Sequence, residues 1–278
     1  MNQLKKVFVL AVLASLAMGV YAEGNRDKST SKIDQIKKAG KVVSGTSADY
    51  PPYEFHSLKD GKDTIVGFDI AIGHEIAKDL GVKLEIKDMQ FDGLLAALQA
   101  GTIDMVISGM TPTEERKKSV DFSSIYYYAV QGVMVRVGDK DKFSTVEALK
   151  GAKLSAQKGT IQVGIAKKQI LGLSDADAEK ESSQVKELGT IKNLVLDLKN
   201  NKVDAIIAEL PVASAYAAKN PDLAIAAPTF KDDEGGSAIA IKKGNEAFVA
   251  AVNATLDRLM NAKLIDQFVA EANDLVEN

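Results

Sequence analysis

Residues 68–107, FDIAIGHEIAKDLGVKLEIKDMQFDGLLAALQAGTIDMVI, decide the fold class of this chain. Apolar residues at positions 68, 70, 72, 76, 77 and 80 recur at helical spacing, and Gly81 is a typical helix end. Residues 82–86 alternate like a strand, residues 91–100 have a second helical pattern, and residues 103–107 form a buried strand. This alternation predicts an α/β fold with a mostly parallel sheet flanked by helices.

The same helix and strand pattern recurs 100 positions later in the chain. Chance similarity between two helix–strand units is the alternative, because such units share apolar spacing. In open α/β sheets a ligand binds beyond the carboxyl ends of the strands, so segments 108–111 and 208–211 are expected to border a site between two lobes. The matched residues are Leu94, Leu98, Asp104 and Ile107, and then Leu194, Leu198, Asp204 and Ile207.

Two β-like runs, 128–137 and 237–241, fit the places where the chain crosses between lobes. If the chain leaves the first lobe at one run and returns at the other, the C-terminal part rejoins the first lobe. The predicted organisation is a signal peptide at 1–22, an N-terminal lead-in at 23–39, lobe 1 at 40–127 with 238–278, and lobe 2 with the hinge strands at 128–237.

The first residues have the order of a secretory signal peptide. Lys5 and Lys6 precede an apolar run over 7–18, and Val20-Tyr21-Ala22 fits a small-residue cleavage site. An uncleaved N-terminal anchor is the alternative. A lipid anchor needs a cysteine at the cleavage point, and the chain has none. The expected product is a soluble, periplasmic protein.

Composition excludes several classes of function. Lys and Arg number 35 against 38 Asp and Glu, and a net charge of −3 argues against a nucleic-acid partner. The absence of cysteine excludes disulfides, thiolate metal sites and cysteine nucleophiles. His56 and His74, the two histidines, leave little material for a zinc site or a Ser-His-Asp triad. No metal and no cofactor is expected.

Residues 47–55, SADYPPYEF, follow the first predicted strand. Pro51 and Pro52 stiffen the backbone, so this segment is expected to be a rigid loop that presents aromatic rings to a ligand. The alternative is a loop that packs only on its own core.

Residues 108–116, SGMTPTEER, follow the buried strand. Gly109 allows close approach of the backbone, Thr111 offers a hydroxyl, and a short helix begins near Thr113, where free N–H groups favour anions. Arg116 is suited to bidentate recognition of a carboxylate. The alternative is a surface ion pair between Arg116 and a neighbouring glutamate.

Residues 157–160, QKGT, predict a strand end, a glycine turn and a helix start in the second lobe, again with donors for an anion. They lack the spacing of a phosphate loop. Glu209 follows the buried run 205–208, and its alternative role is to cap the helix that begins at Pro211. Donors, one acid and aromatic walls together suit a zwitterionic amino acid, whose buried charges both need partners.

At this level the sequence resembles the extracellular solute-binding proteins of polar amino-acid ABC transporters, the glutamine/arginine/lysine–histidine type. The resemblance implies a type II periplasmic binding protein with two α/β lobes joined by two crossing hinge strands, which closes on its ligand. It also implies delivery to an ABC permease in the inner membrane, and a monomer is expected. The segments that carry the resemblance are 45–55, 66–70, 91–98, and 107–118 with 120–123.

The resemblance also implies residue roles. Arg116 would hold the α-carboxylate with help from Gly109 and Thr111, Thr160 would add a donor from the other lobe, and Glu209 would pair with the α-ammonium. Tyr50 and Phe91 would flank the ligand side chain, whose far end would meet Ser47 and Gln157. The full expected set is Ser47, Tyr50, Phe91, Ser108, Gly109, Met110, Thr111, Arg116, Gln157, Thr160, Ile161 and Glu209.

Three positions depart from the family pattern. Glu209 stands where the family often has Asp, and Ile161 stands where a Gly often follows the threonine. Ser47 replaces an Asp that contacts basic or amide side chains in several relatives, which argues against a cationic ligand, although Asp49 partly compensates.

Two other classes of function use the same fold. A cyclohexadienyl dehydratase-like enzyme would use Glu209 as a buried general acid, but no partner base is evident, and no catalytic residue is expected. A sensor domain that binds an amino acid would need a separate membrane protein.

Overall fold

The structure is a computed structural model that describes residues 31–59, 61–181, 183–231 and 235–277. The chain divides into residues Met1–Ser31 and a compact unit, Lys32–Asn278, and the description below concerns that unit. The predicted signal peptide lies outside the described residues. Within the predicted lead-in, Lys32–Ala39 forms helix α2, whose Ile36 is buried in the core.

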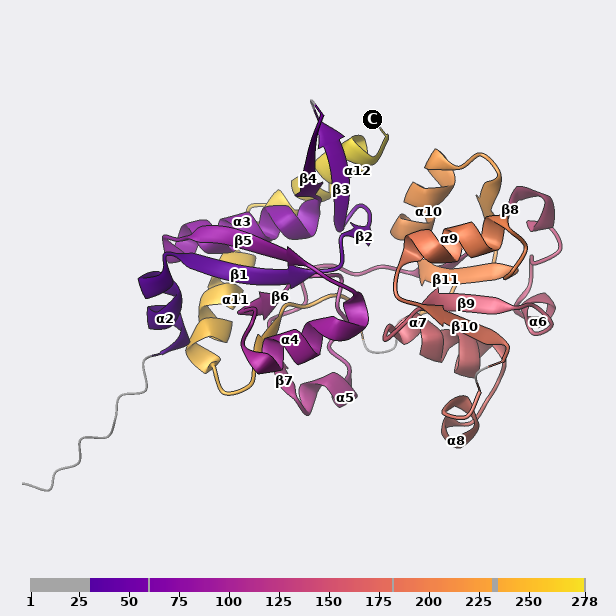
Figure 1. Ribbon diagram of the computed structural model, residues 1–278, viewed down its shortest axis with the longest axis horizontal. Helices are drawn as coiled ribbons and strands as arrows, with labels where there is room; N and C mark the ends of the chain where they lie inside the picture. The colour runs from indigo at the N-terminus through magenta and orange to yellow at the C-terminus, as the bar shows by residue number, and fades with distance from the viewer. Residues whose placement is uncertain (1–30, 60, 182, 232–234, 278) are drawn as a thin grey trace, which may run out of the picture. The chain divides into compact units, whose positions relative to one another are not determined.

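The first lobe is built on a five-stranded sheet in the order β5-β1-β6-β13-β7 (Figure 1). Strand β1 is parallel to β5 and β6, whereas β13, from the end of the chain, is antiparallel to β6 and β7. The C-terminal part of the chain therefore returns to the first lobe and adds β13 to its sheet, between β6 and β7. The strands are β1 Lys41–Thr46, β5 Lys83–Asp88, β6 Met105–Val106, β7 Val120–Phe122 and β13 Ala240–Lys242.

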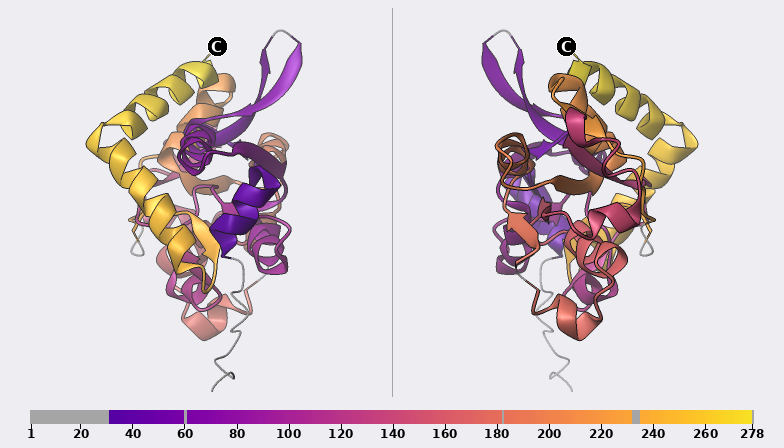
Figure 2. Two further views of the ribbon diagram at one scale, coloured as in Figure 1. Left: turned by 90° about the vertical axis from the view of Figure 1, so that its left-hand side faces the viewer. Right: turned by 90° about the vertical axis from the view of Figure 1, so that its right-hand side faces the viewer.

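Helices cover both faces of this sheet. Helix α3 packs against β5 and β1, α4 packs against β1, β6 and β13, and α11 contacts α2 and α3. The last helix, α12, packs on α3 and α11, and Figure 2 shows α11 and α12 as an angled pair of long helices. The bounds are α3 Phe68–Leu80, α4 Leu94–Ala100, α11 Glu246–Asn261 and α12 Leu264–Glu277.

The second lobe has its own five-stranded sheet in the order β10-β9-β11-β8-β12. Strand β9 is parallel to β10 and β11, and β8 is antiparallel to β11 and β12. The helices that contact this sheet include α7, α9 and α10. The bounds are β8 Gln131–Arg136, β9 Leu154–Gln157, β10 Val185–Leu188, β11 Ala205–Glu209, β12 Leu223–Ile225, α7 Ile161–Gly164, α9 Ile191–Lys199 and α10 Leu210–Lys219.

A small antiparallel sheet, β2-β3-β4, stands beside helix α3. None of the helices in the described ranges has the length and apolar content that crossing a membrane requires. The remaining elements are β2 Asp49–Tyr50, β3 Glu54–Lys59, β4 Lys62–Val66, η1 Phe91–Gly93, α5 Glu114–Lys117, η2 Val137–Asp139, α6 Val146–Leu149, η3 Ile165–Ile170 and α8 Asp175–Ala178.

Two antiparallel segments connect the sheets. Tyr127 bridges Ser237, and Gln131 bridges Phe230, with the Ser237 N–H donating to the Tyr127 carbonyl at 2.8 Å. The α/β, two-lobed fold with two crossing hinge strands is therefore confirmed. The lobe limits at 127/128 and 237/238 fall within this paired region, and they stay predictions.

The internal similarity corresponds to equivalent hydrogen bonding. The Asp104 carboxylate accepts from the Val43 N–H at 2.8 Å, and the Asp204 carboxylate accepts from the Lys153 N–H at 2.9 Å. Each aspartate N–H also donates back to the same partner's carbonyl, at 2.8 Å in both lobes. Each aspartate thus links the start of its own buried strand to the neighbouring parallel strand, which apolar spacing alone would not require.

Candidate ligand-binding site

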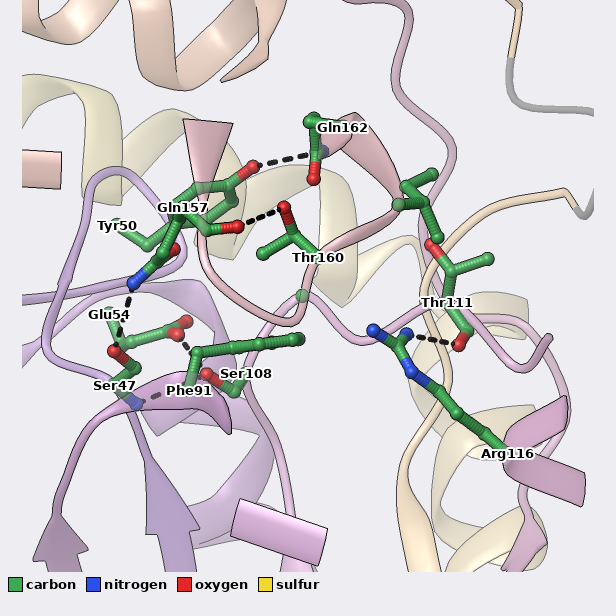
Figure 3. Close-up of a pocket in the computed structure, with 12 residues that line it drawn as sticks. Ser47, Tyr50, Glu54, Phe91, Ser108, Thr111, Arg116, Gln157, Thr160 and Gln162 are labelled. Atoms are coloured by element: carbon green, nitrogen blue, oxygen red, sulfur yellow. Dashed lines mark hydrogen bonds between the residues drawn. The ribbon is translucent and has the colours of Figure 1, made fainter. Parts of the chain in front are cut away.

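A cavity of about 310 Å³, partly open to solvent, lies beyond the carboxyl ends of β1, β6 and β9. Figure 3 shows Arg116 and Thr111 at one side of it, and Ser47, Glu54 and Gln157 at the other. Ten of the twelve expected residues line it, namely Ser47, Tyr50, Phe91, Ser108, Gly109, Thr111, Arg116, Gln157, Thr160 and Ile161.

Arg116 reaches from helix α5 of the first lobe toward the second. Its guanidinium donates to the Thr111 carbonyl at 2.6 Å and to the Gly159 carbonyl at 2.9 Å. The guanidinium carbon also lies 5.4 Å from the centroid of the Phe91 ring, within the distance of a cation–π contact. These contacts hold the planar donor face of Arg116 at the cavity.

The local sequence around Arg116 explains this orientation. The Thr113 hydroxyl caps helix α5 by accepting from the Arg116 N–H at 3.2 Å. Glu114 and Glu115 form ion pairs one turn ahead, with Lys117 and Lys118 respectively. The neighbouring lysines thus partner the two glutamates that were the alternative partners of Arg116.

The second lobe contributes amides at the opposite side of the cavity. The Gln157 amide donates to the Gly189 carbonyl at 3.1 Å and lies 3.4 Å from the Ser47 hydroxyl. The Gln162 amide donates to the Gln131 side-chain oxygen at 2.8 Å. Gln162 lines the cavity and was not predicted, although it directly follows Thr160 and Ile161 at the start of helix α7.

Glu209 is placed behind the cavity rather than on its surface. It ends strand β11, is 3% exposed, and its side chain accepts a hydrogen bond from the Tyr53 hydroxyl. Burial, followed by the Glu209 charge, raises the pKa of Tyr53 well above its ordinary value, so Tyr53 stays a donor. Glu209 occupies the N-cap position of α10 but its side chain makes no capping bond there. The helix-capping alternative therefore does not describe this carboxylate.

Met110 does not line the cavity. Its side chain is 1% exposed and belongs to an apolar cluster with Phe91, Leu94, Leu98 and Val106. Its backbone carbonyl accepts from the Ala238 N–H at 2.9 Å. Met110 therefore supports the loop after β6 from behind, because an apolar side chain at a strand exit gains more from the core than from a polar cavity.

Glu54 also lines the cavity and was not predicted as a ligand residue. It has no exposed surface, and its Oε1 accepts from the Ser108 hydroxyl at 2.5 Å. Behind it, the Gly109 N–H donates to the Asp69 carboxylate at 2.9 Å, so that N–H is already engaged within the protein. Gly109 lines the cavity as expected, and its help to Arg116 in holding a carboxylate stays a prediction.

No cluster of three or more His, Cys, Asp or Glu side chains suited to a metal ion occurs in the described part of the chain. The cavity instead combines a guanidinium, hydroxyls, amides and two aromatic rings, Tyr50 and Phe91. Two α/β lobes joined by two crossing strands, with a polar cavity at the strand ends, define a type II periplasmic-type binding protein.

Comparisons with known proteins identify the family. The model of bacterial extracellular solute-binding proteins, family 3, matches residues 42–271. The chain belongs to this family, as the sequence resemblance predicted, and membership of an extracellular family places it outside the cytoplasm.

Several relatives cover almost the whole chain. The arginine-binding extracellular protein ArtP of Bacillus subtilis (strain 168) is 38% identical over 245 residues, 87% of this chain and 88% of the relative. The ABC transporter glutamine-binding protein GlnH of the same organism is 30% identical over 278 residues, 95% of this chain and 96% of the relative. A crystal structure of the ABC transporter substrate-binding protein AbpA from Streptococcus pneumoniae, bound to L-arginine, superimposes with a TM-score of 0.81. The two sequences are 37% identical, and the superposition covers 88% of this chain and 99% of the AbpA chain.

Proposed function

We propose that this protein captures a polar L-amino acid in the cavity between its lobes and delivers it to an ABC permease. The observation that carries the proposal is Arg116, which is held across the cavity from the first lobe to the Gly159 carbonyl of the second. A guanidinium in this position is suited to hold a ligand carboxylate and, with it, both lobes.

The α-carboxylate is proposed to bind at Arg116, with Thr111 and Thr160 beside it. Glu209 is the proposed partner of the α-ammonium. The hydrogen bond from the Tyr53 hydroxyl orients the Glu209 carboxylate for this role. The Glu209 backbone N–H donates at 3.4 Å to the hydroxyl of Tyr50, which lines the cavity, so residue 209 lies next to the cavity wall.

The side chain of the ligand is proposed to lie between the Tyr50 and Phe91 rings and to end at Ser47 and Gln157. L-arginine is the first candidate and L-glutamine the second. A planar guanidinium stacks well on aromatic rings, and the ArtP and AbpA relatives support arginine. Ser47 replaces an aspartate at this end of the cavity, but Asp49 lies 3.4 Å from the Gln157 amide there and supplies a carboxylate for a cationic side chain.

The protein is proposed to bind without catalysis, since Glu209 already has a role as a counter-charge and the relatives described above are named as binding proteins. A periplasmic location after removal of a signal peptide and a monomeric state complete the proposal. A dehydratase remains the second candidate, and incubation of the pure protein with prephenate or arogenate tests it, because turnover of either compound would contradict a binding-only role.

A thermal-shift screen against all proteinogenic L-amino acids, with D-arginine as a stereochemical control, tests the proposal. A ligand at about 100 times its dissociation constant stabilises the folded protein by about 2.7 kcal/mol. We expect L-arginine or L-glutamine to raise the melting temperature and D-arginine to leave it unchanged. If no amino acid raises it, the proposed function is wrong.

A further inference from the structure

Two buried carboxyl groups lie side by side, Glu54 on β3, which lines the cavity, and Asp69 in the first turn of α3. Neither has any exposed surface. Glu54 Oε1 accepts from Ser108, while Asp69 Oδ2 accepts from the Gly109 N–H and from the Tyr126 hydroxyl, both at 2.9 Å. The other two oxygens, Glu54 Oε2 and Asp69 Oδ1, are buried without a donor.

A single proton between these two oxygens would give both of them a hydrogen-bond partner. Two buried carboxylates in contact repel strongly when both are ionised, and a buried acceptor without a donor is costly. A proton on Glu54 Oε2 that donates to Asp69 Oδ1 removes both penalties. The pair then carries one negative charge instead of two.

A shared proton also fits the side chains that face the pair. Asp49 and Tyr50 face Glu54 from β2, and Tyr126 faces both carboxyls from the segment after β7. These neighbours are acids and phenols, so none of them supplies a positive charge. Burial, followed by the charge of Asp69, raises the pKa of Glu54 well above its ordinary value.

Asp69 is the acceptor of the pair. Burial raises its pKa to about 6, while hydrogen bonds from Gly109, Tyr126 and Glu54 act in the opposite direction. Asp69 accepts two hydrogen bonds from the protein and Glu54 accepts one, so the negative charge of the pair belongs on Asp69 and the proton on Glu54. The donors and acceptors then form one consistent chain, because the Ser47 N–H donates to the Ser108 oxygen at 3.1 Å and the Ser108 hydroxyl donates to Glu54.

We propose that Glu54 is a protonated positioning residue that shares its proton with Asp69 and thereby holds Ser47, Ser108 and Gly109 in the ligand-binding wall. This part of the wall comes from three separate segments, namely the loops after β1 and β6 and strand β3. The shared proton links these segments to Asp69 at the start of α3. The part of this proposal that concerns ligand affinity rests on the proposed function. The shared proton does not.

Infrared spectroscopy of the ligand-free protein tests the proton directly. At neutral pH exposed carboxyl groups are ionised, so a carbonyl stretching band of a protonated carboxylic acid reports a buried one. We expect such a band in the wild type, with a shift in D₂O, and its loss in Glu54→Gln. Glu147→Gln, which changes an exposed carboxyl in α6, is the matched control and should retain the band. Absence of the band in the wild type, or its persistence in Glu54→Gln, would overturn the proposal.

Ligand titration of the same variants tests positioning. In Glu54→Gln the amide NH₂ replaces the shared proton and the amide oxygen still accepts from Ser108, so affinity should stay within about threefold of wild type. The wild type should lose affinity as alkaline pH removes the shared proton, and Glu54→Gln should lose less. Glu54→Ala removes the acceptor of the Ser108 hydroxyl and the proton donor to Asp69 Oδ1, so affinity should fall by about tenfold or more.

The two readouts separate the proposals. If the infrared band behaves as expected and no amino acid binds, the proposed function is wrong and the shared proton stands. If amino acids bind and the band is absent, the proposed function stands and the shared proton is wrong. If Glu54→Gln binds no better than Glu54→Ala while both remain folded, Glu54 does not position the wall through a neutral side chain.

Discussion

Asp49 Oδ2, from the first lobe, accepts a hydrogen bond at 2.5 Å from the backbone N–H of Ile191, the first residue of helix α9 in the second lobe. The free N–H groups at a helix start favour negative charge, so this carboxylate acts as a cap across the cleft. The Tyr216 hydroxyl, from α10, donates to the Asp49 carbonyl at 2.8 Å. Strand β2 of the first lobe is thus hydrogen-bonded to helices α9 and α10 of the second lobe.

Replacement of Asp49 by alanine is expected to favour the open form. Charged hydrogen bonds contribute about 1.5–3 kcal/mol, and this one joins the two lobes, so we expect it to stabilise the closed form and ligand affinity to fall by about tenfold or more in its absence. Small-angle X-ray scattering should show a larger radius of gyration for ligand-free Asp49→Ala. Asp175→Ala, at an exposed ion pair with Lys168, is the control. Equal affinity and size in wild type and Asp49→Ala would show that the cap does not stabilise closure.

His56 predicts a pH dependence of stability. It lies between two carboxylates, with Nδ1 3.0 Å from Asp63 and Nε2 3.1 Å from Asp88, and the Asp88 hydrogen bond is the main cause that raises its pKa above 6.5. A raised pKa stabilises the folded state most fully below pH 6.5, and this contribution is lost as pH rises through the higher, folded value.

The melting temperature of the wild type should therefore fall with rising pH in the range just above 6.5, and His56→Gln should remove part of that fall. His74→Gln, on an exposed position of α3, is the control for loss of a histidine elsewhere. An identical pH profile for His56→Gln and wild type, measured by differential scanning fluorimetry, would contradict this prediction.

Glu209→Gln tests the proposed counter-charge for the ammonium. The amide keeps the size of the side chain and an acceptor for Tyr53 but removes the negative charge, so affinity should fall by about tenfold or more. The melting temperature of the ligand-free protein should change much less than the affinity. Glu187→Gln on β10, whose carboxylate pairs with Lys167, is the control. Calorimetric titration measures the difference, and unchanged affinity would remove Glu209 from the site.

The local pattern predicted the fold because most elements depend on near neighbours in sequence. Helix α3 has the expected bounds, since Gly81 adopts a positive φ of 71° and closes the helix there. The β-like run at 128–137 yields a strand only at Gln131–Arg136, because the residues before it belong to the crossing segment. Hydrophobic pattern alone does not separate a crossing segment from the strand that it enters.

The place of a side chain at the cavity was predicted where it follows from the local turn, as for Arg116, one turn after the cap residue Thr113. It was missed where the role depends on a distant partner. Glu54 was within a predicted binding loop, but its neutral state depends on Asp69 in another element. The contact of Glu209 with Tyr53 joins residues 156 positions apart, and no local spacing predicts it.

Arg116→Ala provides the sharpest test of the binding mode. Removal of one partner of a desolvated charge pair costs about 2–5 kcal/mol, so amino-acid affinity should fall by about 30-fold or more. Arg116→Lys keeps the charge but loses the planar fork, and should recover only part of the affinity. The ligand-free variants should remain folded, because the Arg116 side chain bonds mainly to carbonyls at the cavity edge.

Lys117→Ala is the matched control for Arg116→Ala, because Lys117 is the next residue of the same short helix and pairs with exposed Glu114. Its affinity should equal that of wild type, since an exposed ion pair contributes little. Isothermal titration with the amino acid found in the thermal screen measures all four proteins. If Arg116→Ala and Lys117→Ala bind equally well, the carboxylate is held elsewhere, and Arg116 only joins the lobes through Gly159.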